Sequence, residues 1–127
     1  MDSSKIGERM RIERVNEHLK REISEIIQKE IDDPRLSFVT ILAVDTSRDL
    51  RQAKVYFSAL GTKEQLKTVK NGLESARGFI RKLIGERVVM RNTPELIFVY
   101  DQSVEYGDRI EQTLKEIHES QKNYSDN

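Results

Sequence analysis

The sequence predicts an α+β domain in which amphipathic helices cover one face of a three-stranded sheet. Two observations support this class: some segments repeat apolar residues every three or four positions, and shorter ones are rich in β-branched residues. The segments follow in the order helix, strand, strand, helix, helix, strand, helix. Two layers of this kind bury the apolar side of the sheet against the apolar stripes of the helices. The 127 residues suffice for one domain with one core, to which we assign residues 1–120.

The first helix is predicted over residues 8–31, because apolar side chains recur there at helical spacing. The stripe comprises Ile12, Val15, Leu19, Ile23, Ile26 and Ile27. The remaining faces alternate in charge, which is typical of a solvated helix surface with ion pairs four residues apart. Pro34 ends the helix, since proline disfavours helical geometry at the preceding Asp33.

Two strands are predicted next, over residues 37–45 and 52–60. The first is apolar almost throughout, which predicts burial on both of its faces. The second alternates, and its apolar side consists of Ala53, Val55, Phe57 and Ala59. The polar connection "TSRDLR" has the length of a hairpin loop, so we expect the two strands to pair antiparallel.

Two further helices are predicted between the second and third strands. Thr62 and Gln65 form the pattern of a capping box, which marks the start of the first of them. The helical pattern breaks at Ala76-Arg77-Gly78 and then resumes in "FIRKLIGERV". A glycine inside a helix costs roughly 1 kcal/mol relative to alanine. Gly78 therefore either lets the chain bend, with the small Ala76 on the inside, or permits a close helix–sheet contact.

The last elements are a strand over residues 95–101, which follows Pro94, and a helix over residues 103–120. Ser103 is the expected cap of this helix, whose apolar stripe comprises Tyr106, Ile110, Leu114 and Ile117. Residues 121–127 are polar, and we expect them to form a disordered tail.

The formal net charge is zero, but the charges are segregated along the chain. Residues 63–91 hold eight basic and three acidic residues, a net charge of +5, whereas residues 95–127 hold three basic and eight acidic residues, a net charge of −5. Such asymmetry points to polyanion binding by the basic part. The alternative is a solvated helix whose lysines only maintain solubility, and charge alone does not separate the two interpretations.

Several functional classes find no support in the sequence. There is no cysteine, which excludes disulfides, thiolate metal sites and cysteine nucleophiles. His18 and His118 are a hundred residues apart, with no metal-ligand or nucleophile spacing around them, so we predict neither an enzyme nor a metal or cofactor site. No segment has the length and apolarity of a membrane span or a secretory signal. We expect a cytoplasmic monomer.

The motifs around the glycine resemble those of the ribosome-binding factor A family, over about residues 9–115. The resemblance rests on "RVNEHLKREISEII" and "DPRL", on "VTILAVDTSRDLRQAKVYFSALG", on "SARGFIRKLI", and on "RNTPELIFVYDQS" and "GDRI". Each motif alone is weak, but their order and separation are specific. Residues after about 116 match no motif of the family that we could use.

The resemblance implies a KH-like fold of the second topology, α-β-β-α-α-β, with an added carboxy-terminal helix. An Ala-x-Gly kink at Ala76 and Gly78 replaces the usual Gly-x-x-Gly loop. It also implies a non-catalytic assembly factor that binds the free small ribosomal subunit and its rRNA, near the 5′-terminal helix. Such a factor assists late maturation and 5′-end processing of the precursor rRNA, above all in the cold, and a maturation GTPase is a possible agent of its release.

RNA-binding residues are expected in the basic segment and near the amino terminus. They are Lys67, Lys70, Arg77, Arg81, Lys82, Arg87, Arg91, Arg9, Arg11 and Arg14. Tyr56 and Phe79 are the available stacking groups, although Phe79 lies in a core-like pattern. With few aromatic residues, recognition through the RNA backbone and shape is favoured over base stacking.

Two other functions remain open from the sequence. One is a stand-alone KH-like module for messenger or small RNA, which would need base readout; the loss of the Gly-x-x-Gly loop argues against it. The other is a protein–protein adaptor that docks through the charged first helix, although no large apolar face is evident there.

Overall fold

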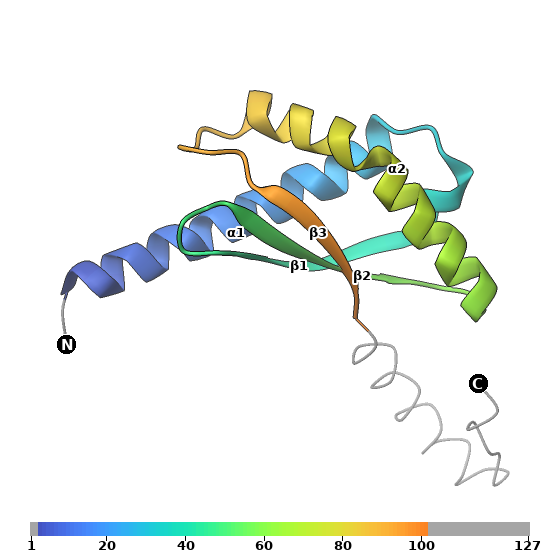
Figure 1. Ribbon diagram of the computed structural model, residues 1–127, viewed down its shortest axis with the longest axis horizontal. Helices are drawn as coiled ribbons and strands as arrows, with labels where there is room; N and C mark the ends of the chain where they lie inside the picture. Colours follow the sequence, from blue (N-terminus) through green and yellow to red (C-terminus); the bar gives the residue numbers. More distant parts are fainter. Residues whose placement is uncertain (1–2, 102–127) are drawn as a thin grey trace, which may run out of the picture.

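The computed structural model describes residues 3–101 of the chain. In chain order, its elements are α1 (Ser3–Lys29), the short 3-10 helix η1 (Pro34–Leu36), β1 (Val39–Thr46), β2 (Gln52–Ala59), α2 (Lys63–Arg87) and β3 (Glu95–Tyr100) (Figure 1). The predicted α+β class with a three-stranded sheet is confirmed. The helix expected over residues 103–120 and the tail over residues 121–127 lie outside the described residues.

The sheet has β2 at its centre, in the order β1-β2-β3. β1 and β2 form the expected antiparallel hairpin, with Val39 opposite Ala59. β3 pairs parallel to β2, with Gln52 opposite Glu95. Two parallel strands begin at the same end of the sheet, so the chain must cross back from the end of β2 to the start of β3. α2 forms that crossover. The sheet is therefore mixed.

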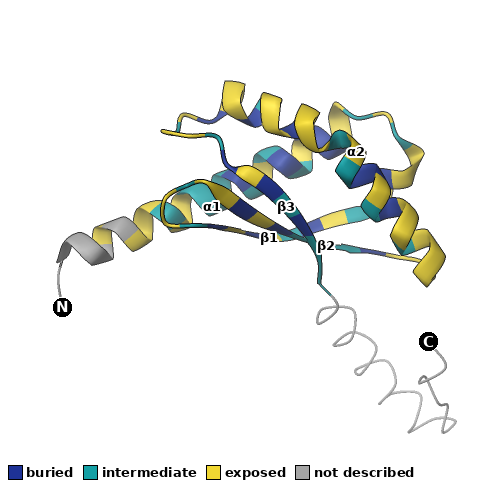
Figure 2. Ribbon diagram, viewed as in Figure 1, coloured by how far each residue is buried: buried dark blue, intermediate teal, exposed yellow. Residues whose placement is uncertain are grey.

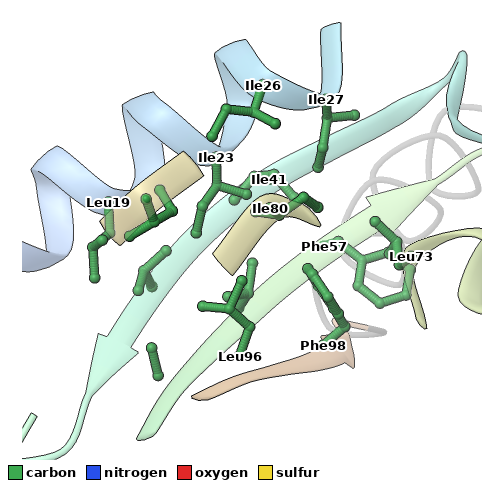
Figure 3. Packing of buried hydrophobic residues seen from close by; sticks show 14 of the residues in the cluster. Leu19, Ile23, Ile26, Ile27, Ile41, Phe57, Leu73, Ile80, Leu96 and Phe98 are labelled. Carbon is green, nitrogen blue, oxygen red and sulfur yellow. The ribbon is translucent and has the colours of Figure 1, made fainter. Parts of the chain in front are cut away.

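Both helices lie on the same side of the sheet, and the core fills the space between them and the strands (Figures 1 and 2). Figure 3 shows Leu19 and Ile23 of α1 and Ile80 of α2 in one cluster with the strand residues Phe57 and Phe98. All five are almost fully buried. Burial of one such side chain stabilises a fold by about 1.5–3 kcal/mol.

The prediction that β1 is buried on both faces is wrong. Ile41 and Val44 are buried, whereas Thr40 and Asp45 are exposed. A bulge between Ile41 and Ala43 shifts the register by one residue. Because of the bulge, the apolar residues of β1 do not alternate regularly with polar ones, so the sequence looks like that of a strand buried on both faces. In the structure, the described helices cover only one face of the sheet (Figure 1).

The first helix is longer at its amino end than expected and ends two residues earlier, at Lys29. The turn at Pro34 becomes η1, which Asp33 caps by accepting a hydrogen bond from the Arg35 amide at 2.9 Å. Arg35 also donates from Nη2 to Asp33 Oδ2 at 2.8 Å. These side-chain hydrogen bonds hold the pKa of the Asp33 carboxyl below its ordinary value.

The start of α2 matches the prediction. Thr62 accepts from the Gln65 amide at 3.3 Å, and Gln65 Oε1 accepts from the Thr62 amide at 2.7 Å, which completes the capping box. Gly61 precedes it at φ 144°, a conformation that side-chain-bearing residues rarely adopt.

The two predicted middle helices are one continuous helix, which corrects the expected break at residues 76–78. Figure 1 shows that the axis of α2 nevertheless changes direction near its middle, as the predicted kink requires. Gly78 is exposed, and a Cβ built there meets nothing within 4 Å. The alternative that Gly78 permits a close helix–sheet contact is therefore wrong. Phe79 is 44% exposed, so its expected place in the core is also wrong.

Candidate nucleic-acid interface

Two of the expected RNA-binding residues on α2 are hydrogen-bonded to backbone carbonyls of the following segment. Arg81 donates from Nη2 to the Thr93 carbonyl at 2.9 Å and from Nε to the Pro94 carbonyl at 3.2 Å. Lys70 donates from its ammonium group to the Phe98 carbonyl of β3. Both side chains thus fasten the last described strand and its approach to α2. Their contact with RNA stays a prediction.

Two other basic residues of α2 form ion pairs within the protein. Arg77 lies 3.3 Å from the carboxylate of Glu74, one turn earlier. Arg87 donates to Glu30 Oε1 at 2.8 Å, which ties the end of α2 to the end of α1. This hydrogen bond raises the pKa of Arg87 above its ordinary value. These four basic residues of α2 are thus engaged in contacts within the protein, which accounts for part of the positive charge of residues 63–91.

The other six expected residues have no hydrogen bond or ion pair to another residue in the described part of the chain. They are Lys67, Lys82, Arg91, Arg9, Arg11 and Arg14, and all are exposed. Lys67 and Lys82 lie on α2, the three amino-terminal arginines on α1, and Arg91 in the connection before β3. Their positive charge is available to an external anion.

Arg11 and Arg91, eighty residues apart in the sequence, meet at one cleft of about 710 Å³. Arg48 of the β1–β2 turn joins them there. The sequence interpretation missed Arg48, because it treated "TSRDLR" only as a hairpin connection. We call this site the arginine cleft. Figure 1 shows its three elements at one end of the molecule: the amino-terminal half of α1, the β1–β2 turn and the loop after α2.

The turn that carries Arg48 is held by hydrogen bonds of its own. The Leu50 amide donates to the Ser47 carbonyl at 2.9 Å, and the Ser47 hydroxyl donates to Asp49 Oδ1 at 2.8 Å. The latter hydrogen bond, with another from the Arg51 amide, lowers the pKa of the Asp49 carboxyl. Arg48 therefore extends from an ordered turn.

Nothing within residues 3–101 suggests a metal centre, since these residues include no group of three or more histidine, cysteine or acidic side chains placed to hold an ion. His18 lies 3.8 Å from Glu22, in the i,i+4 pair that the sequence suggested. His118 is outside the described residues. The helices of the described part include none long and apolar enough to cross a membrane.

The fold and this surface define a small α+β domain whose exposed basic side chains can hold a polyanion. Comparison with known proteins is more specific, because the sequence model of the family described as "Ribosome-binding factor A" matches residues 11–114. A ribosome-binding factor A from Halothermothrix orenii is 49% identical over 113 residues, which cover 89% of this chain and 93% of that protein. The chain belongs to the ribosome-binding factor A family.

Solved structures agree with this assignment. The crystal structure of ribosome-binding factor A from Thermus thermophilus has a TM-score of 0.62 and 32% identity, over 68% of this chain and 91% of that one. A homology model of the Thermus thermophilus factor, as fitted into the cryo-EM map of a 30S–RbfA complex, has a TM-score of 0.56 and 32% identity, over 68% of this chain and 90% of that one. The predicted KH-like fold is confirmed by these neighbours.

Proposed function

We propose that this protein is an assembly factor that binds the free small ribosomal subunit through its rRNA. The observation that carries the proposal is its likeness to the Thermus thermophilus factor, whose coordinates were fitted into the map of a 30S complex. The six basic residues that have no partner among residues 3–101 supply the charge that RNA phosphates require. Ribosomes are cytoplasmic in bacteria, so the proposal places the protein in the cytoplasm.

The proposed mechanism is binding without catalysis. A protein with higher affinity for one arrangement of an RNA shifts the population toward it. We propose that the protein acts in this way late in maturation, near the 5′-terminal helix, and that it assists 5′-end processing, most of all in the cold. Residues 1–120 are proposed as one domain that works as a monomer. Release by a maturation GTPase or by completion of the subunit is part of the same proposal.

The first experiment is co-sedimentation of the purified protein with free small subunits, large subunits and joined ribosomes over a series of salt concentrations. We expect it to bind free small subunits alone, and to bind less as salt increases. Each phosphate contact contributes about 0.7–0.9 to the slope of log K against log salt. Equal binding to all three particles would show that the basic surface binds polyanions nonspecifically. No binding at low salt would contradict RNA binding and favour the protein–protein adaptor.

The structure indicates which variants to use in this assay. Lys67→Gln and Lys82→Gln remove exposed charges that have no partner in the described part of the chain, and each should lower the salt slope by about one unit or slightly less. Arg81→Gln is less suitable, because it also breaks hydrogen bonds to the backbone. The maturation part is tested by mapping the rRNA 5′ end in a strain without the gene, at low and normal temperature; complete processing at both would contradict it.

A further inference from the structure

The arginine cleft has a different construction from the rest of the basic surface. Here three arginines, from α1, the β1–β2 turn and the loop after α2, line one cleft together with an apolar wall. The wall is formed by Ile12 and Val15 of α1, Leu50 of the turn, and Val89 and Met90 of the loop after α2. Val15 and Met90 also pack against the core, so the wall is anchored.

The charge of the cleft is strongly positive. Arg11, Arg48 and Arg91 have no ion pair or hydrogen bond to any other described residue. The one acidic side chain in the lining, Asp49, is occupied, because it accepts hydrogen bonds from the Ser47 hydroxyl and the Arg51 amide. Arg51 Nε also lies 3.8 Å from its carboxylate. The three guanidinium groups are thus available to an anion from outside.

The apolar wall is partly exposed to solvent. Val89 is fully exposed, at 102% of its reference area, two residues after the end of α2. Leu50 has φ 61°, a left-handed conformation that is unfavourable for a non-glycine residue and that is concentrated at functional sites. Both residues lie in the same cleft. An apolar wall next to free guanidinium groups suits a ligand that has a flat face and a negative charge.

We propose that the arginine cleft binds one unpaired nucleotide of RNA, with its base against the wall and its flanking phosphates on the arginines. A guanidinium plane can stack on a base and can also donate two hydrogen bonds to a phosphate, so arginine serves both contacts. Bases in a duplex are stacked and paired, and only an unpaired one can enter a cleft of this kind. The inference rests on the proposed binding of rRNA and adds the structural class of its target, a bulge or single strand.

The test uses two fluorescein-labelled RNA hairpins that differ only in one bulged adenosine. Dissociation constants for the full-length protein are measured by anisotropy. The protein should bind the bulged hairpin roughly 5- to 20-fold more tightly, as expected if one base buries part of its apolar face against the aliphatic wall. Val89→Ser should remove most of this preference, and because the Val89 side chain is fully exposed, the variant should fold normally. The double variant Arg48→Gln/Arg91→Gln should weaken binding of the bulged hairpin by a larger factor than binding of the hairpin without the bulge.

Lys82→Gln is the matched control, since it removes an exposed charge that has no partner in the described part of the chain and that lies on α2, outside the cleft. It should weaken both complexes by the same factor. Equal affinity of the unaltered protein for the two hairpins, or the same behaviour of Val89→Ser and Lys82→Gln, overturns the inference. So does displacement of the bulged hairpin by polyglutamate as efficiently as by unlabelled RNA, which would assign the cleft to an acidic protein segment.

The proposed function can fail separately. Binding of the unaltered protein to free small subunits, without any preference for the bulge, would contradict the cleft proposal and leave the assembly-factor proposal intact. A preference for the bulge without any binding to small subunits would support the cleft proposal and contradict the assembly-factor proposal. The protein would then bind unpaired RNA in general.

Discussion

Replacement of Gly78 by alanine should stabilise the protein. Gly78 lies inside α2, at a negative φ, and a Cβ built there meets no other atom within 4 Å. The substitution therefore gains helix propensity without a steric cost, which amounts to about 0.5–1 kcal/mol. For a chain of 127 residues, 1 kcal/mol shifts Tm by about 3–6 °C, so we expect an increase of about 2–6 °C.

The matched control is the same substitution at Gly72, on the same helix but on its buried face. There a Cβ would lie 3.0 Å from Leu36 Cδ2 and 3.2 Å from Arg35 Cβ. The gain in helix propensity is the same, but overpacking of a filled site typically costs about 1–3 kcal/mol. Gly72→Ala should therefore be less stable than Gly78→Ala by about that amount, measured as the difference in urea unfolding midpoints at equal slope.

A lower Tm for Gly78→Ala would refute this reasoning, because it would show that the bend of α2 needs the flexibility of glycine. The same variant tests the function of the kink. If the bend positions the surface for the ribosome, a helix straightened by alanine should bind free small subunits less well. Unchanged binding would mean that Gly78 is dispensable for the interaction, whatever its effect on Tm.

Three other substitutions test local features of the fold. Gly61→Ala should lower stability by about 1–3 kcal/mol in urea unfolding, because φ is 144° and the new Cβ would lie 2.7 Å from Gln65 Oε1. Arg81→Gln should cost about 1–2 kcal/mol and speed amide exchange in β3, since two hydrogen bonds are lost. Asp33→Asn should destabilise at pH 7, because the Asp33 carboxylate accepts hydrogen bonds from Arg35 that hold its pKa below the ordinary 3.8. The difference from the unaltered protein should shrink as pH falls through that lowered pKa, and a difference that does not shrink as the pH is lowered contradicts this.

The sequence was sufficient wherever a local pattern determines the structure. The alternation of residues 52–60 predicted which side of β2 is buried, and the capping box at Thr62 predicted where α2 begins. Both signals depend on neighbours within a few residues. The continuity of α2 was not predictable in this way, because the cost of Gly78 in propensity is smaller than the gain from the buried residues on either side, such as Leu73 and Ile80.

The candidate site was less predictable, because it depends on contacts between distant segments. The charge of Arg81 led to the prediction of a phosphate contact, but its hydrogen bonds to the Thr93 and Pro94 carbonyls form only once the loop has folded back on α2. Arg48 and Arg91 are both visible as basic residues in the sequence, yet only the fold brings them to one cleft. A pattern along the chain gives the sign of a charge but not its partner.

The parallel pairing of β3 has a consequence for the order in which the chain can fold. The β1–β2 hairpin needs only contacts close in sequence, so it can form during synthesis as soon as residue 59 is available. β3 must wait until α2 and the following loop are complete, because its partner in register lies more than forty residues earlier, as in the pair Gln52 and Glu95. Until then one edge of β2 stays open, and the core lacks Phe98. A chain interrupted before residue 95 would therefore expose both an unpaired strand edge and an apolar hole, the two features that lead nascent chains to aggregate.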